Sequence, residues 1–576
     1  MYSCLWDDEN RKRIFTEKEE EKRKNYTNFG NFICRYQELK TLEIKQDCLF
    51  IDCSFNRLKE ISNLSITSNL ITLECHSNNL TNLNITPLIH LKSLNCSLNS
   101  LLQIDGLEYC HNLISLNCYG NHLLYLDLKN LKNLKNLNCS YNNLSSIYHV
   151  DNGNQLERLI CKKNKINLIN LFGLHELKVL DLGDNLLKSE NILSLDHCIE
   201  LEYFSIRNNF IKDINVSRMK YLRTLNVENN QIESIQGIYF CSHVEYLNCN
   251  DNKIKSMYIG SLENLVEFYC CNNSFSNTHC IFGIELCEKL KKLTISQNDF
   301  YEIKLNNNVS LSELNIEENF FSSTSFYYFT SWIELEYLNI SDNFWKEELD
   351  VSSFSNLKIL KCCKNKLKKI VGLENCSQLE TLDACDNELE VIHLYKKEKL
   401  KVILLKNNKL SGINLKECFA LESIDISNNN IESIYILHLL QLKSISCENN
   451  QIALIETASN PRNIISDSYT KIMFLTKEKM DMRFKLERLR NLDKDEIKLP
   501  VCSICRNFLS YPIKNAVGCH IQTYCTECYI RWFKILKKTN DPNTGLYTFA
   551  IAKEDHLFNE LYDQLIRIYY EEYIEI

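Results

Sequence analysis

Three stretches of the chain read LNCSLNSL (residues 94–101), LNCYGNHL (residues 116–123) and LNCSYNNL (residues 137–144), and they share one pattern. Leucine alternates with cysteine, two residues follow, and then come asparagine, one further residue and leucine. Alternation with a period of two is typical of a short β-strand whose apolar side chains lie on one face. The pattern therefore predicts a strand that ends where the asparagine turns the chain inward.

The same pattern, with Leu-x-Leu in place of Leu-x-Cys in many copies, recurs from Asp52 to Ile452. Nineteen framework asparagines mark it, and fifteen of the eighteen steps between them are 21 or 22 residues long. They are Asn56, Asn78, Asn99, Asn121, Asn142, Asn164, Asn185, Asn209, Asn230, Asn252, Asn273, Asn298, Asn319, Asn343, Asn365, Asn387, Asn408, Asn429 and Asn450. Regular repetition at this period predicts a repeat solenoid in which each coil adds one strand to a parallel sheet. We expect the buried asparagine amides to bond the backbone of adjacent coils, and the convex side to be extended or 3₁₀.

Ten coils carry cysteine at the second inward position of the strand. They are Cys53, Cys75, Cys96, Cys118, Cys139, Cys161, Cys249, Cys270, Cys362 and Cys447. An array of metal sites is one interpretation, but a free cysteine also packs as a small apolar side chain. We interpret the column as a ladder of packed, reduced thiols, which favours a cytoplasmic location, or a host cytosol if the chain is a bacterial effector or a viral protein.

The concave face of the predicted sheet is the expected binding surface, because solenoids usually bind partners there. Its outward strand residues include Asp52, Glu74, Asn95, Asn117, Asn138, Asp181, Asn226, Asn248, Tyr269, Asn315, Asn339, Lys361, Asp383 and Asp425. They contain no set of catalytic side chains, and most are individually consistent with a solvated sheet face. A net charge of −8 argues against a nucleic-acid partner, and no apolar run is long enough to span a membrane. We therefore expect a protein partner.

The repeat is expected to span residues 49–456, with different segments on either side. Residues 1–48 contain the charged run EKEEEKRK and are interpreted as a helical N-terminal cap. Residues 457–498 are interpreted as a helical cap or linker, because Ile472, Leu475, Phe484 and Leu489 have helical spacing.

The composition changes again in residues 499–576. Two CxxC pairs, Cys502/Cys505 and Cys525/Cys528, are separated by nineteen residues. Paired thiolates at this spacing are typical of a tetrahedral Cys₄ zinc site. The sequence therefore predicts one bound zinc ion; four unrelated core cysteines are the alternative.

The repeat region resembles the leucine-rich-repeat family, particularly the short internalin-like type with a cysteine ladder. That resemblance implies a parallel-sheet horseshoe. The C-terminal region resembles the RING and U-box ubiquitin ligases, through CSIC at residues 502–505, QTYCTEC at residues 522–528, Trp532, and DPNTG at residues 541–545. It implies a small α+β zinc domain closed by a helix over residues 549–570.

Carried over residue by residue, the resemblance places the four cysteines in the first RING zinc site. The second site departs from the pattern: its usual histidine falls at Gln522, and the closing cysteine pair is replaced by the DPNTG turn. Cys519 and His520 lie nearby but out of register, and a hydrogen-bonding role is preferred to metal ligation for them. The resemblance therefore implies a hybrid, with zinc at one end and polar contacts of the U-box kind at the other.

RING and U-box domains hold a ubiquitin-charged conjugating enzyme and bias its thioester toward attack, so catalysis is positioning. The resemblance implies a docking groove at Ile504, Pro512, Trp532 and Pro542, which are otherwise interpreted as ordinary packing. Where family members often carry a cationic side chain toward ubiquitin, this chain has Gly545. The favoured hypothesis is an E3 ubiquitin ligase in which the solenoid binds a substrate protein. The alternative is a non-catalytic scaffold with a structural zinc knuckle, and a SUMO-type ligase is a third, less favoured reading.

Overall fold

The computed structural model describes residues 30–474, apart from 46, 153–154, 277–279, 324, 326–331, 458–462, 467 and 469. Beyond residue 474 it describes the backbone of three strands. The chain divides into two compact units, Met1–Leu475 and Thr476–Ile576.

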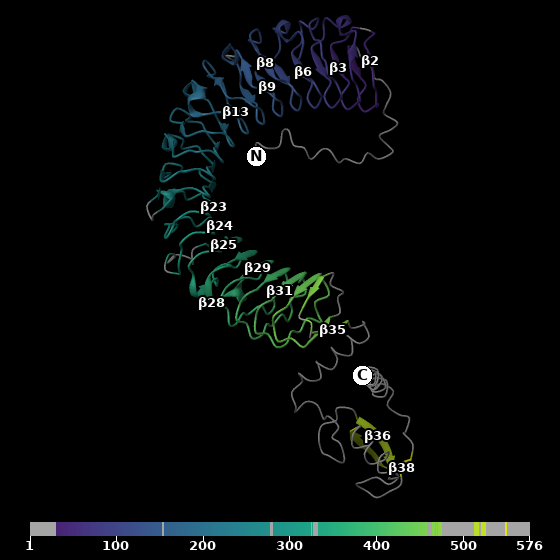
Figure 1. The fold of residues 1–576 in the computed structure, drawn as a ribbon, viewed down its shortest axis with the longest axis vertical. Helices are drawn as coiled ribbons and strands as arrows, with labels where there is room; N and C mark the ends of the chain where they lie inside the picture. The colour runs from purple at the N-terminus through teal and green to yellow at the C-terminus, as the bar shows by residue number, and fades with distance from the viewer. Residues whose placement is uncertain are drawn as a thin grey trace. The chain divides into compact units, whose positions relative to one another are not determined.

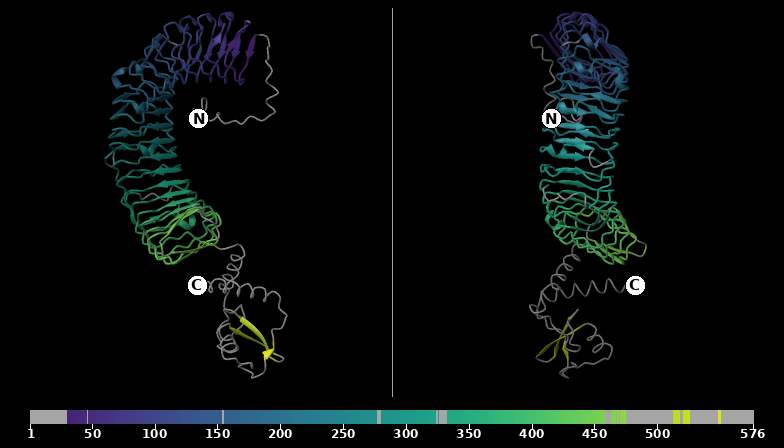
Figure 2. Two further views of the ribbon diagram at one scale, coloured as in Figure 1. Left: turned by 45° about the vertical axis from the view of Figure 1, so that its right-hand side comes forward. Right: turned by 90° about the vertical axis from the view of Figure 1, so that its left-hand side faces the viewer.

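The first unit is a solenoid whose coils build a parallel sheet of 21 strands along the inside of an arc (Figures 1 and 2). Successive strands pair in register, as Leu73 does with Leu94 and Leu94 with Leu116. The strands are β1 (Asn31–Ile33), β3 (Phe50–Asp52), β5 (Thr72–Glu74), β6 (Ser93–Asn95), β7 (Ser115–Asn117), β9 (Asn136–Asn138), β11 (Arg158–Ile160), β13 (Val179–Asp181), β15 (Tyr203–Ser205), β17 (Thr224–Asn226), β19 (Tyr246–Asn248), β21 (Glu267–Tyr269), β23 (Lys292–Thr294), β24 (Glu313–Asn315), β25 (Tyr337–Asn339), β27 (Ile359–Lys361), β29 (Thr381–Asp383), β30 (Val402–Leu404), β31 (Ser423–Asp425), β32 (Ser444–Ser446) and β34 (Asn463–Ile465).

The convex side consists of short parallel ladders and 3₁₀ turns, as expected for coils of 21 or 22 residues. The ladders pair β2 (Leu42–Glu43) with β4 (Ile61–Ser62), β8 (Tyr125–Asp127) with β10 (Ser146–Tyr148), β12 (Ile169–Asn170) with β14 (Ile192–Leu193), β16 (Asp213–Asn215) with β18 (Ser234–Gln236), β20 (Met257–Tyr258) with β22 (Ile281–Phe282), β26 (Lys346–Asp350) with β28 (Lys366–Val371), and β33 (Leu454–Thr457) with β35 (Lys471–Phe474). The turns are η4 (Leu64–Ile66), η5 (Leu107–Tyr109), η6 (Val150–Asn152), η7 (Ser189–Asn191), η8 (Leu195–His197), η9 (Ile238–Phe240), η10 (Ile284–Leu286) and η12 (Leu373–Asn375).

The core lies between these two sides and consists of columns of equivalent side chains, one from each coil. The ladder cysteines from Cys53 to Cys161 are fully buried between leucine columns, and Cys34 extends their column by one coil toward the N-terminus. Burial raises the thiol pKa of Cys75, Cys96 and Cys118 well above the ordinary value. The thiols of this column are therefore neutral and pack as apolar groups, as the sequence predicted.

The framework asparagines join each coil to the one before it. Nδ2 of Asn252 donates to the carbonyl of Val227 in the preceding coil at 3.0 Å and to that of Cys249 in its own coil at 3.2 Å. Its Oδ1 accepts the backbone N–H of Ile232 at 2.9 Å. One side chain therefore satisfies several backbone groups that would otherwise be buried without partners. The expected role of the framework asparagines is confirmed.

A second asparagine ladder, which sequence reasoning missed, runs beside the first. The residue before the framework asparagine has a left-handed backbone, with φ of 55° at Asp184, 53° at Asn208 and 51° at Asn229. Asparagine and aspartate tolerate this region better than other non-glycine residues. Asn208 Nδ2 donates to Asp184 Oδ1 at 2.5 Å, and Asn229 Nδ2 donates to Asn208 Oδ1 at 2.8 Å. The recurrent Asn-Asn pair in the sequence could have indicated this second ladder.

The solenoid extends beyond both predicted ends. Residues 30–48 were expected to belong to a helical cap, but β1 pairs with β3 and Cys34 occupies the cysteine ladder. The framework position of this coil holds Gln37, so a search keyed on asparagine misses it. At the other end, β34 pairs with β32, and Ile472 lies in β35 instead of in the expected helix. Leu475, Phe484 and Leu489 lie outside the described residues.

The described backbone of the second unit is an antiparallel sheet. It contains β36 (Pro512–Val517), β37 (His520–Cys525) and β38 (Thr548–Phe549). β36 pairs with β37, so that Pro512 lies opposite Cys525, and it also pairs with β38.

Candidate functional site

Most of the predicted outward residues on the concave face close the turn that follows each strand. The backbone N–H of Gly183 donates to Asp181 Oδ1, and that of Asn250 donates to Asn248 Oδ1, both at 3.0 Å. Equivalent bonds are made by Asp52, Asn95, Asn117, Asn138, Asn226, Asn315, Asn339, Asp383 and Asp425. Asn339 is only 2% exposed, so this position is structural rather than a solvated contact. Of the predicted outward residues, only Glu74, Tyr269 and Lys361 do not close a turn in this way, so they remain candidates for contact with a partner.

The residues immediately before the strands form a column of alternating charge, here called the entry column. It runs Lys135, Glu157, Lys178, Glu202, Arg223, Glu245 and, after an interruption, Glu336, Lys358, Glu380, Lys401, Glu422, Lys443. Ion pairs join neighbouring coils, at 2.8 Å between Lys135 and Glu157 and at 2.6 Å between Arg223 and Glu245. Because the ion pairs of the column are exposed, the column aligns coils and contributes little to stability.

At the C-terminal end of the first charged run the concave face carries aromatic side chains, here called the tyrosine patch: Tyr203 of β15, Tyr246 of β19 and Tyr269 of β21. The rings of Tyr246 and Tyr269 lie 5.5 Å apart, and the Tyr269 hydroxyl donates to Glu267 Oε2 at 3.0 Å. Burial, aided by the Asp181 carboxylate, raises the pKa of Tyr203 to about 12. Burial and the Glu267 carboxylate raise the pKa of Tyr269. The three tyrosine side chains are half-buried, and carboxylates lie near the hydroxyls of Tyr203 and Tyr269.

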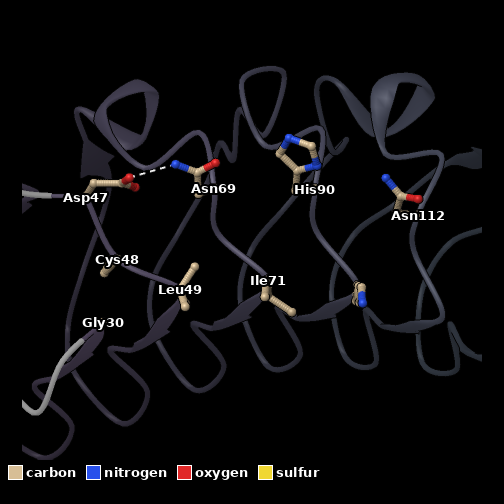
Figure 3. A pocket seen from close by; sticks show the side chains of 9 residues that line it. Gly30, Asp47, Cys48, Leu49, Asn69, Ile71, His90 and Asn112 are labelled. Carbon is tan, nitrogen blue, oxygen red and sulfur yellow. Dashed lines mark hydrogen bonds between the residues drawn. The ribbon is translucent and has the colours of Figure 1, made fainter.

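A shallow hollow of about 520 Å³ lies at the first coils (Figure 3), where Leu49, Ile71 and Lys92 hold the position immediately before the strand. Asp47, Asn69, His90 and Asn112 form one row along it, and the apolar side chains of Leu49 and Ile71 form the other. Asn69 Nδ2 donates to Asp47 Oδ2 at 2.8 Å, and burial raises the pKa of the lining Cys48 thiol to about 11. The neutral Cys48 thiol and His90 belong to coils two steps apart and form no nucleophile–base pair, so the hollow can hold a side chain but is not arranged for chemistry.

The structure gives no support for metal sites along the solenoid. Among the described residues, no group of three or more histidine, cysteine or acidic side chains is placed to hold a metal ion. Three ladder thiols donate to backbone carbonyls of the next coil: Cys161 to Asp181 O at 3.6 Å, Cys249 to Tyr269 O at 3.4 Å and Cys447 to Ile465 O at 3.5 Å. The packing interpretation of the ladder is therefore preferred.

The residues of the predicted zinc site and docking groove lie largely outside the described residues. Cys502, Ile504, Cys505, Cys519, Cys528, Trp532 and Pro542 belong to this group. For Pro512, His520 and Cys525 the structure describes the backbone alone, in β36 and β37. These assignments stay predictions from the sequence.

Comparison with known proteins identifies the fold. No family model matches the chain, and no curated protein matches it. YopM from Yersinia enterocolitica is similar in structure, with a TM-score of 0.64 and 22% identity over 76% of this chain and 91% of that one. A leucine-rich-repeat protein of Leptospira interrogans has a TM-score of 0.53 and 23% identity, covering 59% of this chain and 90% of its own. The plant peptide hormone receptor RGFR1 in complex with RGF2 has a TM-score of 0.53 and 18% identity, covering 77% and 94%.

At these identities the likeness concerns the fold alone, and the fold is a leucine-rich-repeat solenoid. The expected leucine-rich-repeat solenoid fold is thereby confirmed for the first unit. Within the described ranges, no helix has both the length and the apolar character needed to cross a bilayer.

Proposed function

We propose that the protein is a modular ubiquitin ligase, in which the solenoid captures a substrate protein and the C-terminal module docks a ubiquitin-charged conjugating enzyme. The binding half of this proposal is supported by the 21-stranded concave sheet, which offers a long surface and, among its described residues, no catalytic set. A solved protein of similar fold, RGFR1, is a peptide hormone receptor seen with its ligand RGF2. Reduced ladder thiols favour a cytoplasmic setting.

The transfer half rests on one observation, the spacing of Cys502, Cys505, Cys525 and Cys528. Four thiolates in two CxxC pairs suit one tetrahedral zinc ion, which would hold the module's frame. In this proposal Ile504, Pro512, Trp532 and Pro542 contact the conjugating enzyme, and the rate gain comes from orienting its thioester toward a substrate lysine.

The test uses the full chain and a panel of ubiquitin-charged conjugating enzymes, with discharge to free lysine followed in time. Accelerated discharge and about one zinc per chain are expected, and Cys502→Ala with Cys505→Ala should abolish both. The pair Ile504→Ala and Trp532→Ala is the sharper control, because it should abolish discharge while zinc is retained.

The second candidate is a binding scaffold with a structural zinc knuckle, which the absence of a catalytic set among the described residues also fits. Stoichiometric zinc without acceleration of any conjugating enzyme would establish the scaffold in place of the ligase.

A further inference from the structure

Beside the tyrosine patch lie three carboxylates, those of Glu228, Glu267 and Glu317, that make no ion pair within the described part of the chain. Asn248 Nδ2 donates to Glu228 Oε2 at 3.3 Å, and the Tyr269 hydroxyl donates to Glu267 Oε2 at 3.0 Å. Asn339 Nδ2 donates to Glu317 Oε2 at 2.9 Å. Within the described part of the chain, these three carboxylates have no Lys, Arg or His nitrogen within 4.0 Å.

This arrangement differs from that of the ion-paired carboxylates nearby. The entry-column carboxylate of Glu245 pairs with Arg223 at 2.6 Å. Lys292 lies between Glu267 and Glu313 in the register of the sheet; it pairs with Glu313 at 2.9 Å and attracts Glu267 at longer range. Neutral amide and phenol donors orient Glu228, Glu267 and Glu317 without cancelling their charge. Carboxylates that are oriented but not ion-paired are suited to charge-assisted hydrogen bonds from an external cation.

The geometry of the sheet sets the size of the surface. Glu228 follows β17, Glu267 lies in β21, and Glu317 follows β24, which is the fourth strand after β17 in the sheet. At about 4.8 Å per strand, the three carboxylates span about 19 Å, which is the length of about six extended residues. Tyr246 and Tyr269 lie between them, and tyrosine faces attract Lys and Arg side chains.

We propose that this surface, made of Glu228, Glu267, Glu317 and the tyrosine patch, binds an extended protein segment that carries several lysine or arginine residues. The inference rests on the substrate-binding half of the proposed function and is independent of the zinc module. The carboxylates supply the charge complementarity, and the tyrosine rings supply flat contact area for the aliphatic stems of the basic side chains.

The test measures binding of a fluorescein-labelled ten-residue peptide of alternating lysine and glycine to the full chain by fluorescence anisotropy. The variant Glu228→Gln/Glu267→Gln/Glu317→Gln should bind at least about tenfold more weakly, because three charge-assisted contacts become neutral. The matched control is Glu190→Gln/Glu263→Gln/Glu398→Gln, which removes the same charge from exposed residues outside the strands of the main sheet. It should change the dissociation constant by less than about twofold.

Tyr246→Leu should weaken binding about threefold or more, with the far-ultraviolet circular dichroism spectrum unchanged. Equal weakening by the two triple variants would show attraction by net charge alone and would overturn the proposal. Failure of the unmodified chain to bind the peptide at low salt would overturn it too. Ubiquitin discharge to free lysine should be unaffected by either triple variant, so the two proposals fail separately.

Discussion

Raising the pH from 8 to 10 should weaken the solenoid through its cysteine ladder. Burial holds the pKa of the Cys53, Cys75, Cys96 and Cys118 thiols well above the ordinary value of 9.0. In the unfolded chain these thiols lose their protons near pH 9, whereas in the folded chain they keep them, so stability falls as the pH rises past that value. At pH 10 each thiol lowers the free energy of unfolding by about 1.4 kcal/mol, and the four together lower it by about 5 kcal/mol relative to pH 8.

The assay is urea-induced unfolding at both pH values, followed by circular dichroism, for the natural chain and for a variant with alanine at all four positions. Alanine is compatible with the ladder, because Ala384 occupies the same position in a later coil and is fully buried. At pH 8 the variant is less stable than the natural chain, since buried volume is lost. Between pH 8 and 10 the free energy of unfolding should fall by about 5 kcal/mol less in the variant than in the natural chain. If both chains lose stability equally over this range, the thiols ionise in the folded state and the reasoning is refuted.

Three further predictions concern single positions and are checked by thermal and urea unfolding. Asn252→Ala removes hydrogen bonds to three carbonyls and one N–H and should lower the free energy of unfolding by about 2–4 kcal/mol. The control Asn79→Ala, at an exposed position, should lower it by less than about 0.5 kcal/mol. Similar losses for the two variants would contradict the framework role. Gly237→Ala should cost more than about 2 kcal/mol, because φ is 75° and the new Cβ would lie 2.4 Å from a side-chain atom of the adjacent coil. Gly412→Ala, with nothing within 4 Å, should be neutral, and equal effects of the two glycine changes would argue against the close approach. Lys401→Gln should leave the midpoint unchanged within error, since the entry-column pair is exposed, and a fall of several degrees would show that the column stabilises the fold.

The sequence predicted the solenoid because its determinants are local and repeated. A period of two within each strand and a period of 21 or 22 between strands leave one way to stack the apolar side chains. The framework asparagines were assigned correctly because a buried amide at a turn has few other ways to be satisfied. The coils at both ends were missed because they lack the framework asparagine by which the repeat was recognised. The framework position of the first coil holds Gln37, and no asparagine follows Ile464 at the usual spacing.

The concave face was harder to predict, because the same residue types serve structure and binding there. Asn248 and Asp181 have the composition of a polar contact surface, but their side chains accept backbone bonds two residues ahead. Nothing in a single coil distinguishes them from Glu228, whose partner is a side chain twenty residues away. Which carboxylates are compensated depends on contacts between coils, and these require the register of the sheet.

The bonds of the framework asparagines also bear on how such a chain can change over generations. The side chain of Asn252 bonds only its own coil and the coil before it, and its backbone N–H bonds Asn272 O of the next coil, as the equivalent residue does in other coils. Removal or duplication of one whole repeat would therefore present the same donors and acceptors at the new junction, and the neighbouring coils would close over it as before. Unequal recombination within the gene could thus lengthen or shorten the concave surface in steps of one strand without redesign of the core, and each step would shift the spacing between contact sites on either side of it.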